Sequence, residues 1–125
     1  MARVLVVDDE LDIREAVTEV LSYEGHEVVT ACDGAEALRK CAALQPDLVL
    51  LDLMMPGMNG WEFRAAQLRD AAISDIPVVV LSALGRVSSI DALAFLPKPF
   101  GLDDLLDLVR RAARPGRDDG HAATL

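Results

Sequence analysis

Short, uninterrupted apolar runs recur along this chain and alternate with longer stretches in which apolar residues return every three or four positions. The short runs are rich in valine and leucine and lack the polar alternation of a half-exposed strand. They are therefore typical of strands buried on both faces of a parallel sheet. They predict five strands, at residues 3–7, 27–31, 47–51, 76–81 and 94–96. The repeated order of strand and then helix predicts an α/β fold with right-handed crossovers.

The longer stretches have the pattern of helices with one buried face. Apolar stripes run along three of them, at Ile13, Val17, Val20 and Leu21, at Leu38, Cys41 and Ala42, and at Leu102, Leu105, Leu106 and Val109. Two helix starts are indicated by pairs spaced as in a capping box, Asp33 with Glu36 and Asn59 with Glu62. Five strands in so small a domain favour the doubly wound, flavodoxin-like order 2-1-3-4-5, which places the first and third strands side by side.

The length of 125 residues suits one domain with a single core. We expect this domain to span residues 1–113, because residues 114–125 contain proline, glycine and charges but no apolar stripe, as in a flexible tail or linker. The net charge of −9 argues against nucleic acid as a partner. No apolar stretch approaches the roughly 20 residues that span a bilayer, so we expect a cytoplasmic protein without membrane contact.

The two cysteines, Cys32 and Cys41, are separated by eight residues and have no neighbouring histidine. This spacing matches neither a zinc site nor a redox Cys-x-x-Cys motif. The sequence therefore predicts two reduced and mostly buried thiols.

Polar residues follow the predicted strands where the strands end. Asp8 and Asp9 follow the first strand, and Asp52 follows the third. Because the carboxyl ends of parallel strands meet at one edge of a sheet, these carboxylates would share a crevice and repel one another unless a cation lies among them. Mg²⁺ prefers such oxygen ligands. Ser82 and Lys98 follow the fourth and fifth strands and complete a set suited to phosphoryl transfer.

Four motifs at these strand ends resemble, in order, the signatures of the response-regulator receiver domain of two-component signalling. The motifs are "VLVVDDE" (4–10), "LVLLDLMMPGMNGWE" (48–62), "VVVLSA" (78–83) and "FLPKPF" (95–100). The resemblance covers about residues 3–113.

The resemblance implies that Asp52 accepts a phosphoryl group from a phosphohistidine on a sensor histidine kinase or phosphotransfer protein. Mg²⁺ would be the cofactor, with the ligands Asp8, Asp9, Asp52 and the backbone carbonyl of Met54. Further implied roles are a cation for the phosphate at Lys98, a hydroxyl for a phosphoryl oxygen at Ser82, a switch aromatic at Phe95 and a cis peptide before Pro99. The chain would catalyse only its own phosphorylation and dephosphorylation. It would signal to an unknown downstream protein as a monomer or a phosphorylation-dependent dimer.

One departure from the family pattern concerns the connection between the last two strands. Sixteen positions separate Ser82 from Lys98, which is fewer than receivers generally use. We therefore expect a non-standard, shortened or disordered fourth helix around residues 84–93, with Val87, Ile90 and Leu93 as its apolar stripe.

Other functions remain open. An atypical receiver would act as an interaction module that is never phosphorylated. An aspartate-nucleophile phosphatase of the haloacid-dehalogenase type is disfavoured, because Met54 stands where such enzymes need a second aspartate. Met54 and Leu84, each two positions after a site residue, are apolar and cannot orient water, which predicts slow self-dephosphorylation.

Overall fold

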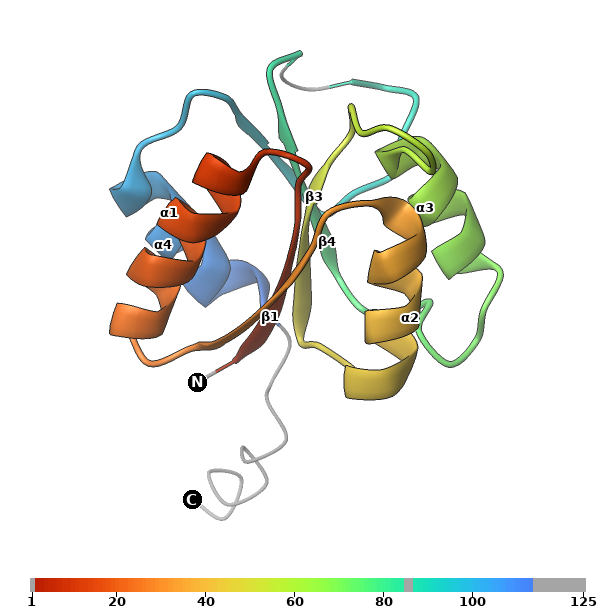
Figure 1. Ribbon diagram of the computed structural model, residues 1–125, viewed down its shortest axis with the longest axis horizontal. Coiled ribbons are helices and arrows are strands. Elements are labelled where there is room, and N and C mark those ends of the chain that lie inside the picture. The colour runs from red at the N-terminus through yellow and green to blue at the C-terminus, as the bar shows by residue number, and fades with distance from the viewer. Residues whose placement is uncertain (1, 85–86, 114–125) are drawn as a thin grey trace.

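A computed structural model describes residues 2–84 and 87–113 and contains one five-stranded sheet (Figure 1). The strands are β1 (Arg3–Val7), β2 (Glu27–Ala31), β3 (Leu48–Asp52), β4 (Val78–Ser82) and β5 (Ala94–Pro97). All neighbouring pairs are parallel, and the order is β2-β1-β3-β4-β5. The sheet order predicted from the sequence is confirmed.

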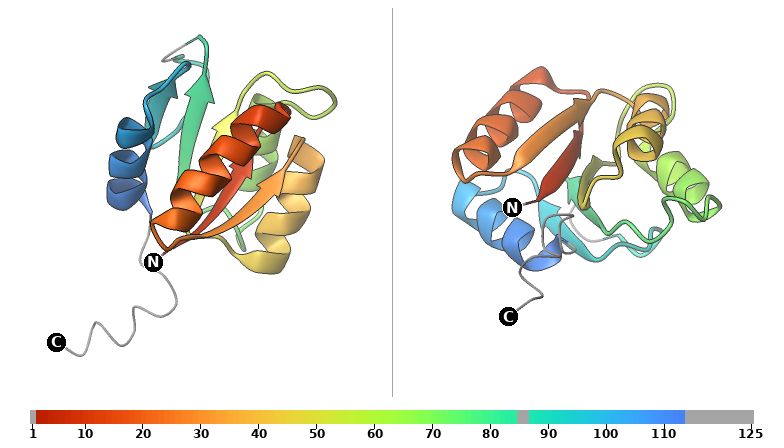
Figure 2. Two further views of the ribbon diagram at one scale, coloured as in Figure 1. Left: turned by 60° about the vertical axis from the view of Figure 1, so that its left-hand side comes forward. Right: turned by 90° about the horizontal axis from the view of Figure 1, so that it is seen from below.

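Four helices cover the two faces of the sheet. They are α1 (Leu11–Tyr23), α2 (Gly34–Leu44), α3 (Gly60–Leu68) and α4 (Leu102–Ala112). Helices α1 and α4 lie on one face, and α2 and α3 lie on the other (Figures 1 and 2). None of the helices within the described residues is long and apolar enough to cross a membrane. The predicted tail, residues 114–125, lies outside the described part of the chain.

The sheet separates two apolar cores, which explains the continuous apolar runs in the sequence. On β1, Val4 packs into the core beneath α1 and α4, whereas Leu5 packs into the core beneath α2 and α3. The same division applies to the central strands β3 and β4, in which every residue is buried. The edge strands β2 and β5 are only partly buried. The central strands are therefore apolar along their length because both of their faces are buried. Polar side chains occur only where these strands end.

The predicted helix starts are present, and one of them differs in detail. Asn59 and Glu62 form a complete capping box at the start of α3, with side-chain hydrogen bonds of 2.9 Å in both directions. At α2, the Asp33 side chain accepts from the backbone N–H of Glu36, but the Glu36 carboxylate accepts from the N–H of Cys32. This hydrogen bond, with support from Lys40, lowers the pKa of Glu36 to about 2.

The prediction of two mostly buried thiols is wrong for Cys32. Cys41 is buried on the core face of α2, and this burial raises the pKa of its thiol to about 12. Cys32 is exposed, and its Sγ donates to the carboxylate of Glu36 at 3.3 Å. The chain leaves the sheet at the end of β2, so the residue after Ala31 no longer lies between packed layers.

The connection from β4 to β5 contains no helix in its described positions, 83–84 and 87–93. The expected departure from the family pattern is therefore present, but as a non-standard, irregular connection and not as a shortened helix. Residues 87–93 form an irregular segment, which we call the bridging segment. Its Ile90 side chain is buried in the core beneath α2 and α3. Trp61 Nε1 donates to Ser89 Oγ at 2.9 Å, and Arg64 Nε donates to the carbonyl of Asp91 at 2.8 Å. The backbone N–H of Leu93 donates to the Val78 carbonyl at 2.8 Å. Serine and aspartate favour turns, so one buried side chain and these three hydrogen bonds take the place of the hydrogen bonds within a helix.

We expect amide hydrogens in the bridging segment to exchange faster with solvent than those in α4. Residues 87–93 lack a helical hydrogen-bond ladder, and segments of this kind open at low free-energy cost. Hydrogen exchange followed by mass spectrometry measures the difference, with α3 as a control because it borders the same core. Protection of residues 87–93 equal to that of α4 would contradict this expectation.

Candidate functional site

The carboxyl ends of the strands bring the predicted polar residues to one edge of the sheet. Asp8 directly follows β1, and Asp52 is the last residue of the neighbouring β3. Ser82 ends β4, which pairs with β3 on its other side. Lys98 follows β5 and reaches back toward the carboxylates. The four side chains come from four strands, so the position of each depends on the packing of the sheet rather than on a single loop.

Three carboxylates converge at this edge. Asp8, Asp9 and Asp52 each offer an oxygen atom, and these atoms all lie within 4.8 Å of one another. Asp8 is fully buried and Asp52 is 5% exposed, whereas Asp9 is exposed. Burial raises the pKa of Asp52 to about 6, and the charge of Asp8 adds to this effect, while Lys98 opposes it. Such a cluster of repelling oxygens fits a hard divalent cation such as Mg²⁺.

Lys98 supplies a positive charge to the cluster. Its Nζ atom lies 2.8 Å from Asp8 Oδ2, 3.1 Å from Glu10 Oε1 and 3.6 Å from Asp52 Oδ1. Burial lowers the pKa of Lys98, but its hydrogen bonds to Asp8 and Glu10 outweigh this effect and raise the pKa overall. The ammonium group is therefore charged at neutral pH and partly offsets the negative charge of the site.

Two hydrogen bonds, one from a backbone N–H and one from a side chain on α1, hold the loop that carries Asp8. The backbone N–H of Glu10 donates to Asp8 Oδ1 at 2.9 Å, and the guanidinium of Arg14 donates to the Asp8 carbonyl at 2.7 Å. Sequence reasoning missed Glu10 and Arg14 as site residues. The available signal was their spacing of four positions at the start of α1, which places both side chains on one helix face.

The residues assigned to the switch lie on the two strands next to β3 on that side of the sheet, Ser82 at the end of β4 and Phe95 within β5. Ser82 is buried, and its hydroxyl oxygen accepts a hydrogen bond from the backbone N–H of Leu84 at 3.0 Å. Phe95 is partly buried against the core beneath α2 and α3. The Lys98–Pro99 peptide bond is cis. The backbone N–H of Met54 faces Asp52 Oδ1 at 3.4 Å, which is long for a hydrogen bond.

The loop after Asp52 packs tightly against the backbone of β3. The backbone N–H of Gly60 donates to the Leu53 carbonyl at 3.0 Å. A Cβ atom at Gly60 would lie 2.7 Å from both the Asp52 carbonyl oxygen and Leu53 Cα. A side chain is therefore excluded at this position, and the loop returns to the strand directly behind Asp52.

Comparison with known proteins identifies related chains along the whole described region. The family model of the response regulator receiver domain matches residues 4–110. The response regulator MprA of Mycobacterium leprae is 40% identical over 129 residues, covering 98% of this chain and 56% of that protein. MprA of Mycolicibacterium vanbaalenii is 44% identical over 125 residues, covering 94% of this chain and 53% of that protein. The chain thus spans about half the length of the curated relatives it matches.

Solved structures agree with this assignment. The chemotaxis response regulator CheY4 of Vibrio cholerae superimposes with a TM-score of 0.80 at 35% identity, covering 89% of this chain and 98% of that one. The response regulator protein TrrA of Thermotoga maritima, in complex with Mg²⁺ and BeF, gives a TM-score of 0.76 at 36% identity, with the same coverage of 89% and 98%. The strand order, the clustered acids and these relatives agree, and the chain belongs to the response regulator receiver domain family of two-component signalling.

Proposed function

We propose that this chain receives a phosphoryl group on Asp52 in a reaction that depends on Mg²⁺. The observation that carries the proposal is the convergence of three carboxylates within 4.8 Å, with the Lys98 ammonium 3.6 Å from Asp52. Mg²⁺ would be held by Asp8, Asp9, Asp52 and the backbone carbonyl of Met54. The complex of Thermotoga maritima TrrA with Mg²⁺ and BeF supports the same chemistry for a related fold.

The phosphoryl donor is a phosphohistidine on a sensor histidine kinase or phosphotransfer protein. An Asp52 carboxylate oxygen attacks the phosphorus atom, so an O–P bond forms while the P–N bond breaks and its electron pair stays on the imidazole nitrogen. Lys98 offsets the charge on the transferred oxygens. When bound, Mg²⁺ supplies further charge neutralisation between carboxylate and phosphoryl oxygens. Hydrogen bonds from the Glu10 backbone N–H and the Arg14 guanidinium keep Asp8 in place during the transfer.

The phosphorylated state differs from the free state by its contacts at Ser82. The Ser82 hydroxyl turns from the N–H of Leu84 to donate to a phosphoryl oxygen, and Phe95 moves toward the space that Ser82 leaves. This exchange favours one of two conformations of the surface around β5, which a downstream protein then recognises. The protein works in the cytoplasm, as a monomer or as a dimer that forms on phosphorylation.

Intact-mass measurement after incubation with phosphoramidate or acetyl phosphate tests the proposal. We expect one phosphate adduct on the wild type in Mg²⁺, no adduct in EDTA and no adduct on Asp52→Asn, because the amide lacks a nucleophilic oxygen. Asp12→Asn is the matched control, since Asp12 is an exposed acid on the first turn of α1 and should retain the adduct. A folded wild-type protein that binds Mg²⁺ but takes phosphate from no donor would contradict the proposal.

That negative result would favour a second candidate, a receiver that acts as an interaction module without phosphorylation. The bridging segment supports this candidate, because it replaces a helix on the face that changes in the switch. Phosphatase activity of the haloacid-dehalogenase type has no such support. Met54, at the position of the required acid, is apolar and 63% exposed.

Once formed, the phosphoaspartate is expected to persist for minutes or longer without a phosphatase. Met54 and Leu84 are exposed and apolar, so neither side chain can orient water for attack on the acyl phosphate. Following the adduct by intact mass after donor removal measures its lifetime. Met54→Asn provides a polar group at one of these positions and should shorten the lifetime several-fold. Loss of the wild-type adduct within seconds would refute this expectation.

A further inference from the structure

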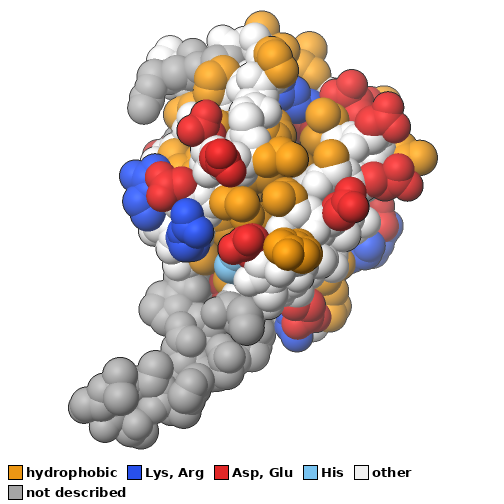
Figure 3. Space-filling model, turned by 90° about the vertical axis from the view of Figure 1, so that its left-hand side faces the viewer, with side chains coloured by type: hydrophobic (Ala, Val, Ile, Leu, Met, Phe, Trp, Pro, Cys, Tyr) orange, Lys and Arg blue, Asp and Glu red, His pale blue; other side chains and the backbone are white. Residues whose placement is uncertain are grey.

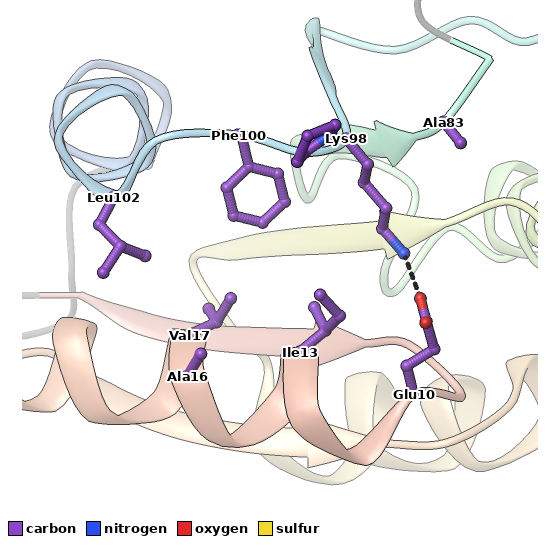
Figure 4. A pocket seen from close by; sticks show the side chains of 9 residues that line it. Glu10, Ile13, Ala16, Val17, Ala83, Lys98, Phe100 and Leu102 are labelled. Carbon is purple, nitrogen blue, oxygen red and sulfur yellow. Dashed lines mark hydrogen bonds and ion pairs between the residues drawn. The ribbon is translucent and has the colours of Figure 1, made fainter.

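Glu10 stands at the N-terminal end of α1, but its side chain does not cap the helix. Within the described residues its carboxylate makes no hydrogen bond to the first turn. Its Oε1 atom instead accepts a hydrogen bond from Lys98 Nζ at 3.1 Å. Figure 4 shows the two side chains pointing toward each other, one from the start of α1 and one from the end of β5. The Glu10 carboxylate is therefore directed at the lysine rather than at the helix.

The Lys98 ammonium lies closer to the α1 side of the site than to the proposed nucleophile. It is 2.8 Å from Asp8 and 3.1 Å from Glu10, but 3.6 Å from Asp52. Asp8 belongs to the carboxylate cluster that suits a divalent cation, so its oxygens would be shared between Lys98 and a bound metal ion. Glu10 lies outside that cluster. Of the three carboxylates around Lys98, Glu10 is thus the one that a bound metal would leave unchanged.

On the side of Lys98 that faces α1 and α4, the described residues offer no other carboxylate in place of Glu10. An apolar pocket of about 430 Å³ adjoins the ion pair, between α1 and the start of α4 (Figure 4). Apart from Glu10 and Lys98, the described residues that line it are apolar: Ile13, Ala16, Val17, Ala83, Pro99, Phe100 and Leu102. Figure 3 shows the same face, on which hydrophobic side chains gather between acidic ones. If Glu10 were removed, the side chains that line this pocket would provide no other acceptor for the ammonium.

We propose that Glu10 is a positioning residue that holds the Lys98 ammonium on the α1 side of the site and away from Asp52 until a phosphoryl group arrives. The ammonium already contacts Asp8 at 2.8 Å, so without Glu10 the attraction of Asp52, 3.6 Å away, draws it further into the carboxylate cluster and onto the oxygen that the phosphorus atom needs. This inference rests on the proposed function. The Glu10 side chain is 61% exposed, so the pair contributes little to folding, and variants at this position should fold normally.

Calorimetric titration with Mg²⁺ and the rate of phosphorylation by phosphoramidate test the proposal together. We expect Glu10→Ala to weaken Mg²⁺ binding and to slow phosphorylation, each by about fivefold, which is the upper end of the range for an exposed ion pair. Glu10→Gln keeps an oxygen that accepts from Lys98 and should restore part of both. Asp12→Asn removes the same charge from the same helix end, and Asp12 is not among the carboxylates that pair with Lys98. It should change both quantities less than Glu10→Ala does.

Combining Glu10→Ala with Lys98→Met shows whether Glu10 acts through the lysine. In the Lys98→Met background, Glu10→Ala should affect Mg²⁺ binding no more than Asp12→Asn does. Equal weakening by Glu10→Ala in both backgrounds would overturn the proposal, because Glu10 would then act on Mg²⁺ directly by its charge. Wild-type binding and rates in Glu10→Ala would also overturn it. If the wild type took no phosphate, the proposed function would fail, whereas the Mg²⁺ titrations would still decide the role of Glu10.

Discussion

Replacing Lys98 with methionine is expected to lower the free energy of unfolding by about 3 kcal/mol when Mg²⁺ is absent. The change keeps the length of the side chain but leaves Asp8 and Asp52 without the cation that lies 2.8 Å and 3.6 Å from them. Asp8 is fully buried, so water cannot compensate for the lost ion pair. Urea denaturation in EDTA measures the loss. Saturating Mg²⁺ should recover most of it, since a divalent cation among the carboxylates replaces the missing charge.

Lys40→Met is the matched control for this experiment. Lys40 pairs with Glu36 at 3.0 Å, but both side chains are partly exposed and lie away from the carboxylate cluster. Its removal should cost less than about 1 kcal/mol. The cost should be the same with and without Mg²⁺. An equal loss for Lys98→Met in EDTA and in Mg²⁺ would show that Lys98 stabilises the fold independently of the metal cluster.

A second large effect is expected from Gly60→Ala, which should destabilise the protein by about 3 kcal/mol. The added methyl group would lie 2.7 Å from the Asp52 carbonyl oxygen and from Leu53 Cα. These are backbone atoms of the last residue of β3 and of the buried residue that follows it, so they cannot move without disturbing the position of Asp52. We therefore expect slower phosphorylation as well as lower stability. Thermal denaturation and phosphoramidate labelling of the same sample measure the two effects.

Gly57→Ala separates this packing effect from the general cost of changing a glycine in the loop. Gly57 has a φ of +69°, so an alanine there is strained, but no atom lies within 4 Å of the added methyl group. The strain should cost about 1 kcal/mol. A Gly60→Ala variant as stable as Gly57→Ala would show that the loop can move away from β3 at little cost.

The middle of the sheet could be predicted from the sequence because a single physical requirement determines it. Strands buried on both faces need continuous apolar residues, and β1, β3 and β4 show this pattern without interruption. The strand order then places Asp8 next to Asp52, so the carboxylate cluster follows from topology. The strand limits differ slightly from the prediction, because β3, β4 and β5 each extend one residue beyond their predicted ends, to Asp52, Ser82 and Pro97.

The remaining features depend on contacts between residues far apart in the chain. The exposure of Cys32 depends on where β2 leaves the packed layers. The bridging segment depends on Trp61 and Arg64, which lie 28 and 27 positions from their partners. The pairing of Glu10 with Lys98 spans 88 positions. Periodicity within a short window reports local structure and burial, and such distant side-chain contacts leave no signal in it.

The few contacts of the bridging segment also determine how much free energy phosphorylation must supply to displace it. A packed helix would have to be displaced as a unit, whereas this segment is held by the buried Ile90 and by single side-chain hydrogen bonds from Trp61 and Arg64. The partly buried Val87 and Ala92 add apolar contacts, and the backbone N–H of Leu93 donates to the Val78 carbonyl at 2.8 Å. Each such hydrogen bond contributes about 1 kcal/mol net. A coupling free energy of about 1 to 3 kcal/mol between distant sites, which is typical of proteins, is comparable to these contacts. A single covalent change at the sheet edge would then be enough to redistribute the segment between held and released states.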